Sequence, residues 1–259
     1  MIQAVATATP PEAPAASPIG RSLRAQARIE LLLLLRQPEN LLVILVLPVL
    51  LLLFFAEVRA FPSIHGRPIN FLVPGILTLA LMSTGMVSLG ISTAYQRYYR
   101  VLKRLGATPL PRAVLVAAKA GSVLLVEVGQ VALVLAIGYF GFAWRPPGSL
   151  PLAILVMLVG AIMFAALGLT MAGVMRAELT IGGANGLYLI FLILGGVAMP
   201  VQQLPDLVRQ LASVLPPTAL SSSLRAVLAG GAFPAAPVAL LAGWTLLLLA
   251  TAIRFFRWE

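Results

Sequence analysis

Few side chains in this sequence could do chemistry, and Glu127 has the most unusual setting among them. It lies deep in a long apolar run and has no basic residue nearby in the sequence. A carboxylate in such a place is costly and usually serves a function. Glu127 therefore lines a transport path or pairs with a residue from another segment; alternatively, it is a protonated or paired structural carboxyl that orients helices.

Other reactive chemistry has little support. The chain has no cysteine and a single histidine, His65, which excludes thiol catalysis, disulfides and clustered histidine metal sites. It lacks the Gly-x-x-x-x-Gly-Lys-Ser/Thr phosphate loop, so it cannot bind ATP by that route. An intramembrane enzyme would need a histidine cluster, a cysteine or paired carboxylates, and none is evident. We therefore expect no catalytic residue, no metal site and no cofactor bound by this chain.

Six apolar stretches must position the remaining candidates. The chain has 259 residues, of which 60% are hydrophobic and 10% charged, and this composition is very unlike that of a soluble domain. A helix needs about 20 apolar residues to cross a bilayer, and the stretches lack the alternation of barrel strands. The sequence predicts an all-α integral membrane protein with six transmembrane helices at 41–56, 71–94, 113–143, 152–175, 181–200 and 238–253.

The basic residues indicate the orientation. With the N-terminus in the cytoplasm, the inner segments hold 12 of the 18 basic residues and the outer loops hold five. Positive residues mark the cytoplasmic side, so both termini are expected inside. The net charge of +10 then suits anionic headgroups rather than nucleic acid. Lys119 is expected to snorkel from the third stretch into the inner headgroups.

The flanking segments differ in character. Residues 1–17 are rich in Ala and Pro and predict a disordered tail, followed by an interfacial amphipathic helix at 18–38 and a six-helix transmembrane domain at 39–259. Arg21, Arg24 and Arg28 share one face of the interfacial helix, although a plain basic flank would also explain them. Between the last two stretches, residues 201–236 predict two short amphipathic helices, separated by a proline pair, that re-enter the outer leaflet.

The loop at 96–112 predicts a short two-faced helix on the cytoplasmic side. Gly106 is placed to end it, with Pro109 soon after. The helix either docks a soluble partner or lies on the membrane surface. Its basic stripe comprises Arg97, Arg100 and Arg104, and its apolar stripe comprises Tyr98, Leu102 and Leu105.

Taken together, these features resemble the membrane permease subunit of ABC transporters of the type-2 class, which includes drug and polysaccharide exporters. Four segments carry the resemblance: the interfacial helix, Asn-Phe-Leu-Val-Pro-Gly-Ile at 70–76, the basic loop with Leu-Lys-Arg-Leu-Gly-Ala-Thr-Pro-Leu-Pro-Arg at 102–112, and the proline-punctuated segment 199–217. The resemblance implies a six-span permease, paired with a second copy or a related permease, in the plasma (inner) membrane of a prokaryote. It also implies a separate cytoplasmic ATPase that binds ATP and Mg²⁺.

The resemblance assigns roles to two groups of residues. Loop 96–112 would be the coupling helix that contacts the ATPase, through Gln96, Arg97, Arg100, Lys103, Arg104 and Gly106. Gln96 stands where the family often has a glutamate. The second and fifth spans would line the substrate path, for which the candidates are Thr84, Ser88, Asn185 and Tyr188. Glu127 of the third span is a further path candidate, on its own chemistry. Small hydroxyl residues also permit close helix packing, which explains Ser and Thr more simply. The alternative function is an ion-coupled secondary carrier that uses Glu127.

Overall fold

The computed structural model describes residues 19–57, 67–108, 111–196 and 200–255, and all the regular structure in these ranges is helical. The predicted tail at 1–17 and His65 lie outside them. The elements are α1 (Ile19–Leu35), α2 (Pro38–Glu57), α3 (Ile69–Met82), η1 (Ser83–Ser88), α4 (Leu89–Tyr98), α5 (Val101–Gly106), α6 (Arg112–Ala136), η2 (Ile137–Gly141), α7 (Leu150–Val174), α8 (Ala177–Leu194), η3 (Val201–Gln203), α9 (Asp206–Ser213), α10 (Pro216–Leu228) and α11 (Ala235–Phe255).

Five helices in the described ranges are long and apolar enough to cross a membrane: Ile69–Tyr98, Ala113–Gly141, Leu150–Val174, Ala177–Leu194 and Ala235–Arg254. They match the second to sixth predicted stretches, and the all-helical prediction is confirmed. The first stretch falls on α2, whose apolar part at Ile44–Glu57 is shorter than the other five. A membrane span at 41–56, and with it the total of six spans, therefore stays a prediction.

The fifth span ends earlier than the sequence predicted. Helix α8 stops at Leu194 instead of continuing to Pro200. Gly196 adopts the left-handed conformation with φ 65°, which only glycine enters without strain. Just before it, the Gly195 amide donates the last helical bond, to the Phe191 carbonyl at 2.8 Å. Gly195 and Gly196 thus end α8, although the apolar run continues beyond them and had predicted a longer span.

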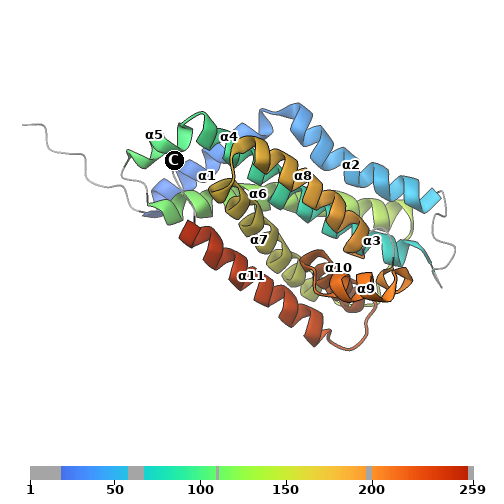
Figure 1. Ribbon diagram of the computed structural model, residues 1–259. Helices are drawn as coiled ribbons and strands as arrows, with labels where there is room; N and C mark the ends of the chain where they lie inside the picture. The colour runs from blue at the N-terminus through green and yellow to red at the C-terminus, as the bar shows by residue number, and fades with distance from the viewer. Residues whose placement is uncertain (1–18, 58–66, 109–110, 197–199, 256–259) are drawn as a thin grey trace, which may run out of the picture.

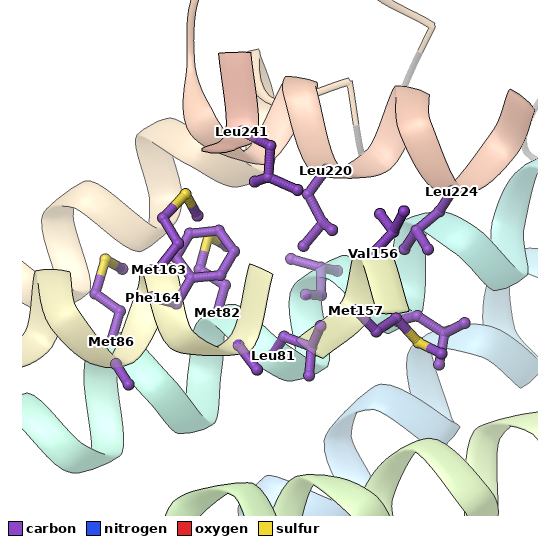
Figure 2. Packing of buried hydrophobic residues seen from close by; sticks show 14 of the residues in the cluster. Leu81, Met82, Met86, Val156, Met157, Met163, Phe164, Leu220, Leu224 and Leu241 are labelled. Atoms are coloured by element: carbon purple, nitrogen blue, oxygen red, sulfur yellow. The ribbon is translucent and has the colours of Figure 1, made fainter. Parts of the chain in front are cut away.

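Helix α7 is at the centre of the hydrophobic core. Met163 and Phe164 are fully buried, and they pack with Met82 and Met86 from the helix formed by α3 and η1. Figure 2 shows this layer together with side chains of α10 and α11, among them Leu220. Because apolar side chains here meet other helices, α7 is the scaffold against which the remaining elements are placed.

A close backbone contact joins α7 to η1. A Cβ on Gly168 would lie 2.6 Å from the Gly85 carbonyl oxygen, and a Cβ on Gly85 would lie 3.0 Å from the Ala165 amide nitrogen. Small residues allow membrane helices to approach this closely. The polar segment of the second span is therefore fixed against α7 along this side.

Helices α3, η1 and α4 form one continuous rod from Ile69 to Tyr98, and η1 is its π-helical middle. The rod ends where Arg100 adopts a left-handed backbone with φ 58°. Helix α5 then starts at Val101 and ends at Gly106, the predicted stop. The prediction of a single two-faced helix from 96 onward was wrong, because the chain turns at Arg100 and separates Arg97 from α5.

The two ends of the helical bundle differ. Helices α1 and α5 lie at one end, and α9 and α10 lie at the other (Figure 1). Two short helices occupy the predicted segment 201–236, and the second of them, α10, begins at the proline pair Pro216–Pro217. Proline is well suited to the first turn of a helix, where its missing N–H has no partner to lose.

Candidate functional site

A groove of about 960 Å³ runs between α1 and α2 on one side and η1, α4 and α8 on the other. Its walls are largely apolar, with a limited number of polar side chains at defined places. Such a mixture is typical of sites that hold an amphipathic molecule and orient it through a few polar groups. The polar lining residues come from three parts of the chain. Gln26 and Glu30 lie on α1, and Gln37 follows that helix. The second span and its end contribute Ser83, Ser88, Ser92, Tyr95, Gln96 and Tyr99, and α8 contributes Asn185 and Tyr188.

The structure brings together four of the residues singled out from the sequence. Ser88, Gln96, Asn185 and Tyr188 all line this groove. The Asn185 amide donates to the Ile181 carbonyl at 2.9 Å, which leaves its side-chain oxygen available on an exposed face of α8. Helix α4 and η1 supply one wall of the groove and α8 another. That the second and fifth spans line a substrate path stays a prediction.

Thr84 does not line the groove. Its side chain is 1% exposed and its hydroxyl donates to Gln130 Oε1 at 3.0 Å. Thr84 therefore binds a residue of α6, a contact that the residues around Thr84 in the sequence did not predict.

Glu127 also lies away from the groove lining. Its side chain is 2% exposed, and neither carboxylate oxygen has a hydrogen-bond partner among the described residues. The interpretation in which Glu127 pairs with another span thus has no support in the described part of the chain. A buried carboxyl without such a partner costs more free energy than one that is paired or hydrogen-bonded.

A buried polar cluster lies beside the groove where α1 meets α6 and the end of α4. Lys119 of α6 forms an ion pair with Glu30 of α1, with Nζ and Oε2 3.0 Å apart. Lys119 also donates to Gln96 Oε1 at 2.5 Å, while the Gln96 amide donates to Glu30 Oε2 at 3.4 Å. On the other side, Gln26 Nε2 donates to Glu30 Oε1 at 3.1 Å. We call these four residues the Glu30 cluster.

The Glu30 cluster corrects one prediction. Lys119 is 1% exposed, so it does not snorkel toward headgroups. Helix α1 packs along α6 and covers the ammonium group, and Glu30 supplies the charge that makes this burial tolerable. The sequence analysis missed Glu30 and Gln26. The available signal was their spacing of four residues, which places both on one face of α1.

The basic loop separates into an exposed and an internal part. Arg100, Lys103, Arg104 and Gly106 are exposed, and the fully buried Leu102 holds α5 on the bundle. Arg97 instead donates to the Gly173 carbonyl at 2.8 Å and also to the Met175 carbonyl, at the end of α7. Arg97 thus donates hydrogen bonds to carbonyls at the C-terminus of α7 that lack a partner within the helix, and a cation is favourable at that end.

At the opposite end, Arg225 of α10 connects three elements. Its guanidinium donates to the Gly196 carbonyl at 2.6 Å and stacks over the Phe71 ring, with 3.8 Å from Cζ to the ring centroid. Burial lowers the Arg225 pKa to about 10. The end of α8 is therefore held against the start of α3 by a partly desolvated cation.

Helices of membrane-crossing length around a groove with polar side chains define an integral membrane protein of the transport class. Comparison with known families makes this specific: residues 21–229 match the family described as ABC-2 type transporter, and the chain belongs to that family. It is accordingly a type-2 ABC permease, as the resemblance predicted.

Two relatives agree with this assignment. The chain is 26% identical over 219 residues to a Bacillus subtilis (strain 168) protein named "Putative transport permease YvfS", a match that covers 81% of this chain and 86% of the relative. It is also 26% identical over 175 residues to "ABC transporter G family member 20" of Dictyostelium discoideum. That match covers 66% of this chain and 24% of the longer relative.

Proposed function

We propose that this chain is the permease subunit of an ATP-driven exporter, and that it forms the substrate path as a dimer with a second copy or a related permease. The observation that carries the proposal is the groove. It extends from Val101 and Leu105 of α5, past the Glu30 cluster, to Asn185 and Tyr188 of α8. Helix α5, whose basic side chains are exposed and could contact an ATPase, thus adjoins the groove in which a substrate would bind.

In this proposal α2 is the first of six spans, both termini are cytoplasmic, and α9 and α10 re-enter the outer leaflet of a prokaryotic plasma membrane. Ser88, Asn185 and Tyr188 contact the substrate because they line the groove. Thr84 and Glu127, which do not line it, act at most indirectly on the path.

Coupling to the ATPase is assigned to the exposed side chains of the loop, Arg100, Lys103 and Arg104. The ATPase is a separate polypeptide that binds ATP and Mg²⁺, and its closure would shift α5. Such a shift changes the groove only if contacts differ between the two states. Gln96 and Arg97 supply candidate contacts of this kind, because they link the end of the second span to α6 and α7.

The test is to co-express the permease with its native genomic neighbours, purify it in mild detergent, and ask whether an ATPase comes with it. We expect an ATPase to co-purify, and expect Arg100→Glu together with Arg104→Glu to abolish the association. Arg209→Glu is the matched control, since Arg209 is an exposed arginine of α9, at the other end of the bundle. An ATPase that binds equally well to the double variant would refute the assignment of the coupling surface.

The ion-coupled carrier remains the alternative. The observation in its favour is that Glu127 is buried and has no hydrogen-bond partner within the described ranges. It predicts that no ATPase co-purifies and that an ion gradient drives uptake into proteoliposomes. Under this alternative Glu127→Gln abolishes transport, whereas an exporter that uses ATP should tolerate the substitution in its ATP-dependent transport.

A further inference from the structure

A proline in the wall of the groove leaves a backbone carbonyl without its helical partner. Pro48 lies inside α2, and proline has no N–H to donate to the carbonyl four residues earlier. That carbonyl belongs to Ile44, which is 4% exposed. In an apolar setting such a group is costly unless another donor reaches it.

Gln130 of α6 supplies the missing donor. Its Nε2 donates to the Ile44 carbonyl oxygen at 2.7 Å, and its Oε1 accepts from the Thr84 hydroxyl at 3.0 Å. Gln130 is 0% exposed. A single buried amide therefore uses its donor on α2 and its acceptor on η1. Bonds of this kind count for more where water is excluded.

The two bonded elements are two walls of the same groove. Ile44 and Pro48 line it from α2, while Ser83 and Ser88 line it from η1. Gln130 is not among the lining residues and acts from behind both walls.

The wall formed by η1 is packed closely on its other side, because Gly85 and Gly168 bring η1 against α7. Helix α2 packs against α3. At the height of Pro48, the amide of Gln130 adds a direct link from α2 to η1.

We propose that Gln130 is a positioning residue for the groove: it replaces the backbone donor lost at Pro48, ties α2 to η1, and so sets the width available to a substrate. The substrate-size part of this proposal rests on the proposed function, in which the groove is the transport path. The hydrogen-bond part does not depend on it.

The hydrogen-bond part is tested by a double-mutant cycle on the thermal unfolding midpoint of the purified protein in detergent. Gln130→Leu should lower the midpoint by several degrees. Pro48→Ala with Gln130→Leu should regain part of that loss, because the new backbone amide at position 48 can donate to the Ile44 carbonyl, while the Thr84 hydroxyl stays without its acceptor. The double variant also keeps the test usable if the single variant does not accumulate.

Pro151→Ala is the matched control. Pro151 lies in the first turn of α7, where a proline releases no helical carbonyl. Adding Pro151→Ala to Gln130→Leu should recover nothing. If Gln130→Leu causes the same loss with and without Pro48→Ala, the role of Gln130 at the proline is overturned.

The groove-width part is tested in proteoliposomes that contain the permease and its ATPase, with fluorescent amphiphiles of increasing ring number as probes. Pro48→Ala with Gln130→Leu should change the ratio of large to small probes transported at least threefold, although its stability is partly restored. An unchanged ratio would overturn the positioning role and leave a structural hydrogen bond. If the unaltered complex transports no probe, the proposed function fails for these substrates, while the stability cycle still decides the role of Gln130.

Discussion

Replacing Lys119 by methionine would remove the positive member of the Glu30 cluster and leave the shape of the site nearly unchanged. The ion pair is 3.0 Å long, and its side chains are 1% and 8% exposed. Breaking a buried pair at one partner typically costs about 3–5 kcal/mol, since the other charge stays buried without compensation. Against a total stability of about 5–15 kcal/mol, this is a large fraction.

Replacing both partners gives the opposite expectation. Lys119→Met combined with Glu30→Leu leaves no uncompensated charge, and such replacements are often neutral or stabilising by about 1–4 kcal/mol. The double variant should therefore be more stable than Lys119→Met alone by at least about 3 kcal/mol. This pattern is a property of burial and does not depend on what the protein transports.

The assay is equilibrium unfolding of the detergent-solubilised protein by increasing denaturant, with helicity as the signal. Arg104→Met is the control, because Arg104 is an exposed basic residue of α5 and such changes usually stay within about 0.5 kcal/mol. A loss below about 1 kcal/mol for Lys119→Met would refute the reasoning, since that is the range of solvent-exposed pairs. The lysine would then reach the headgroups, as the sequence alone suggested.

Three further perturbations follow from the structure. Gly168→Ala should lower the unfolding midpoint by several degrees, because its Cβ would lie 2.6 Å from a carbonyl oxygen of η1. Gly129→Ala should be neutral or slightly stabilising, because a Cβ there meets nothing within 4 Å. Calorimetry of the two variants compares them directly. Asn185→Leu should lower transport of polar probes more than of apolar ones at unchanged expression, and a uniform loss in the proteoliposome assay would count against a substrate contact. Arg225→Met should cost about 1–3 kcal/mol through the lost bond to the Gly196 carbonyl and the lost stacking on Phe71, and an unfolding midpoint equal to that of the unaltered protein would argue that neither contact persists.

Helix content and most helix positions could be predicted because they depend on local composition. Apolar runs of membrane length produced the second to sixth spans, and proline and glycine located several boundaries, including the start of α10 at Pro216 and the end of α5 at Gly106. These signals act within a few residues of the sequence. Asn185 and Tyr188, which line the groove, stand out as polar side chains in an apolar helix, but it was the family resemblance that proposed them for the path.

The Glu30 cluster could not be predicted in this way, because its members come together from distant positions. Glu30 and Lys119 are 89 residues apart, and nothing in the flanking residues identifies one as the partner of the other. Basic residues near a membrane boundary usually snorkel, and the contrary outcome at Lys119 depends on how α1 lies on α6. The turn at Arg100 was missed because a left-handed arginine has no signature in composition.

The π-helical turn in η1 also determines what a change in chain length would do. A π turn bonds each residue to the fifth rather than the fourth along, so a deletion of one residue within Ser83–Ser88 could restore an uninterrupted α-helix at little local cost. Each residue of an α-helix advances the rotation by about 100°, whereas the wider π turn advances it less per residue, so the extra residue is taken up within Ser83–Ser88. After such a deletion α4 would keep nearly its present rotation relative to α3, and Gln96 and Arg97 would still face their partners on α6 and α7. We therefore expect that an alignment of functional relatives lacking this π turn shows a one-residue gap here, with the polar residues that follow in unchanged register.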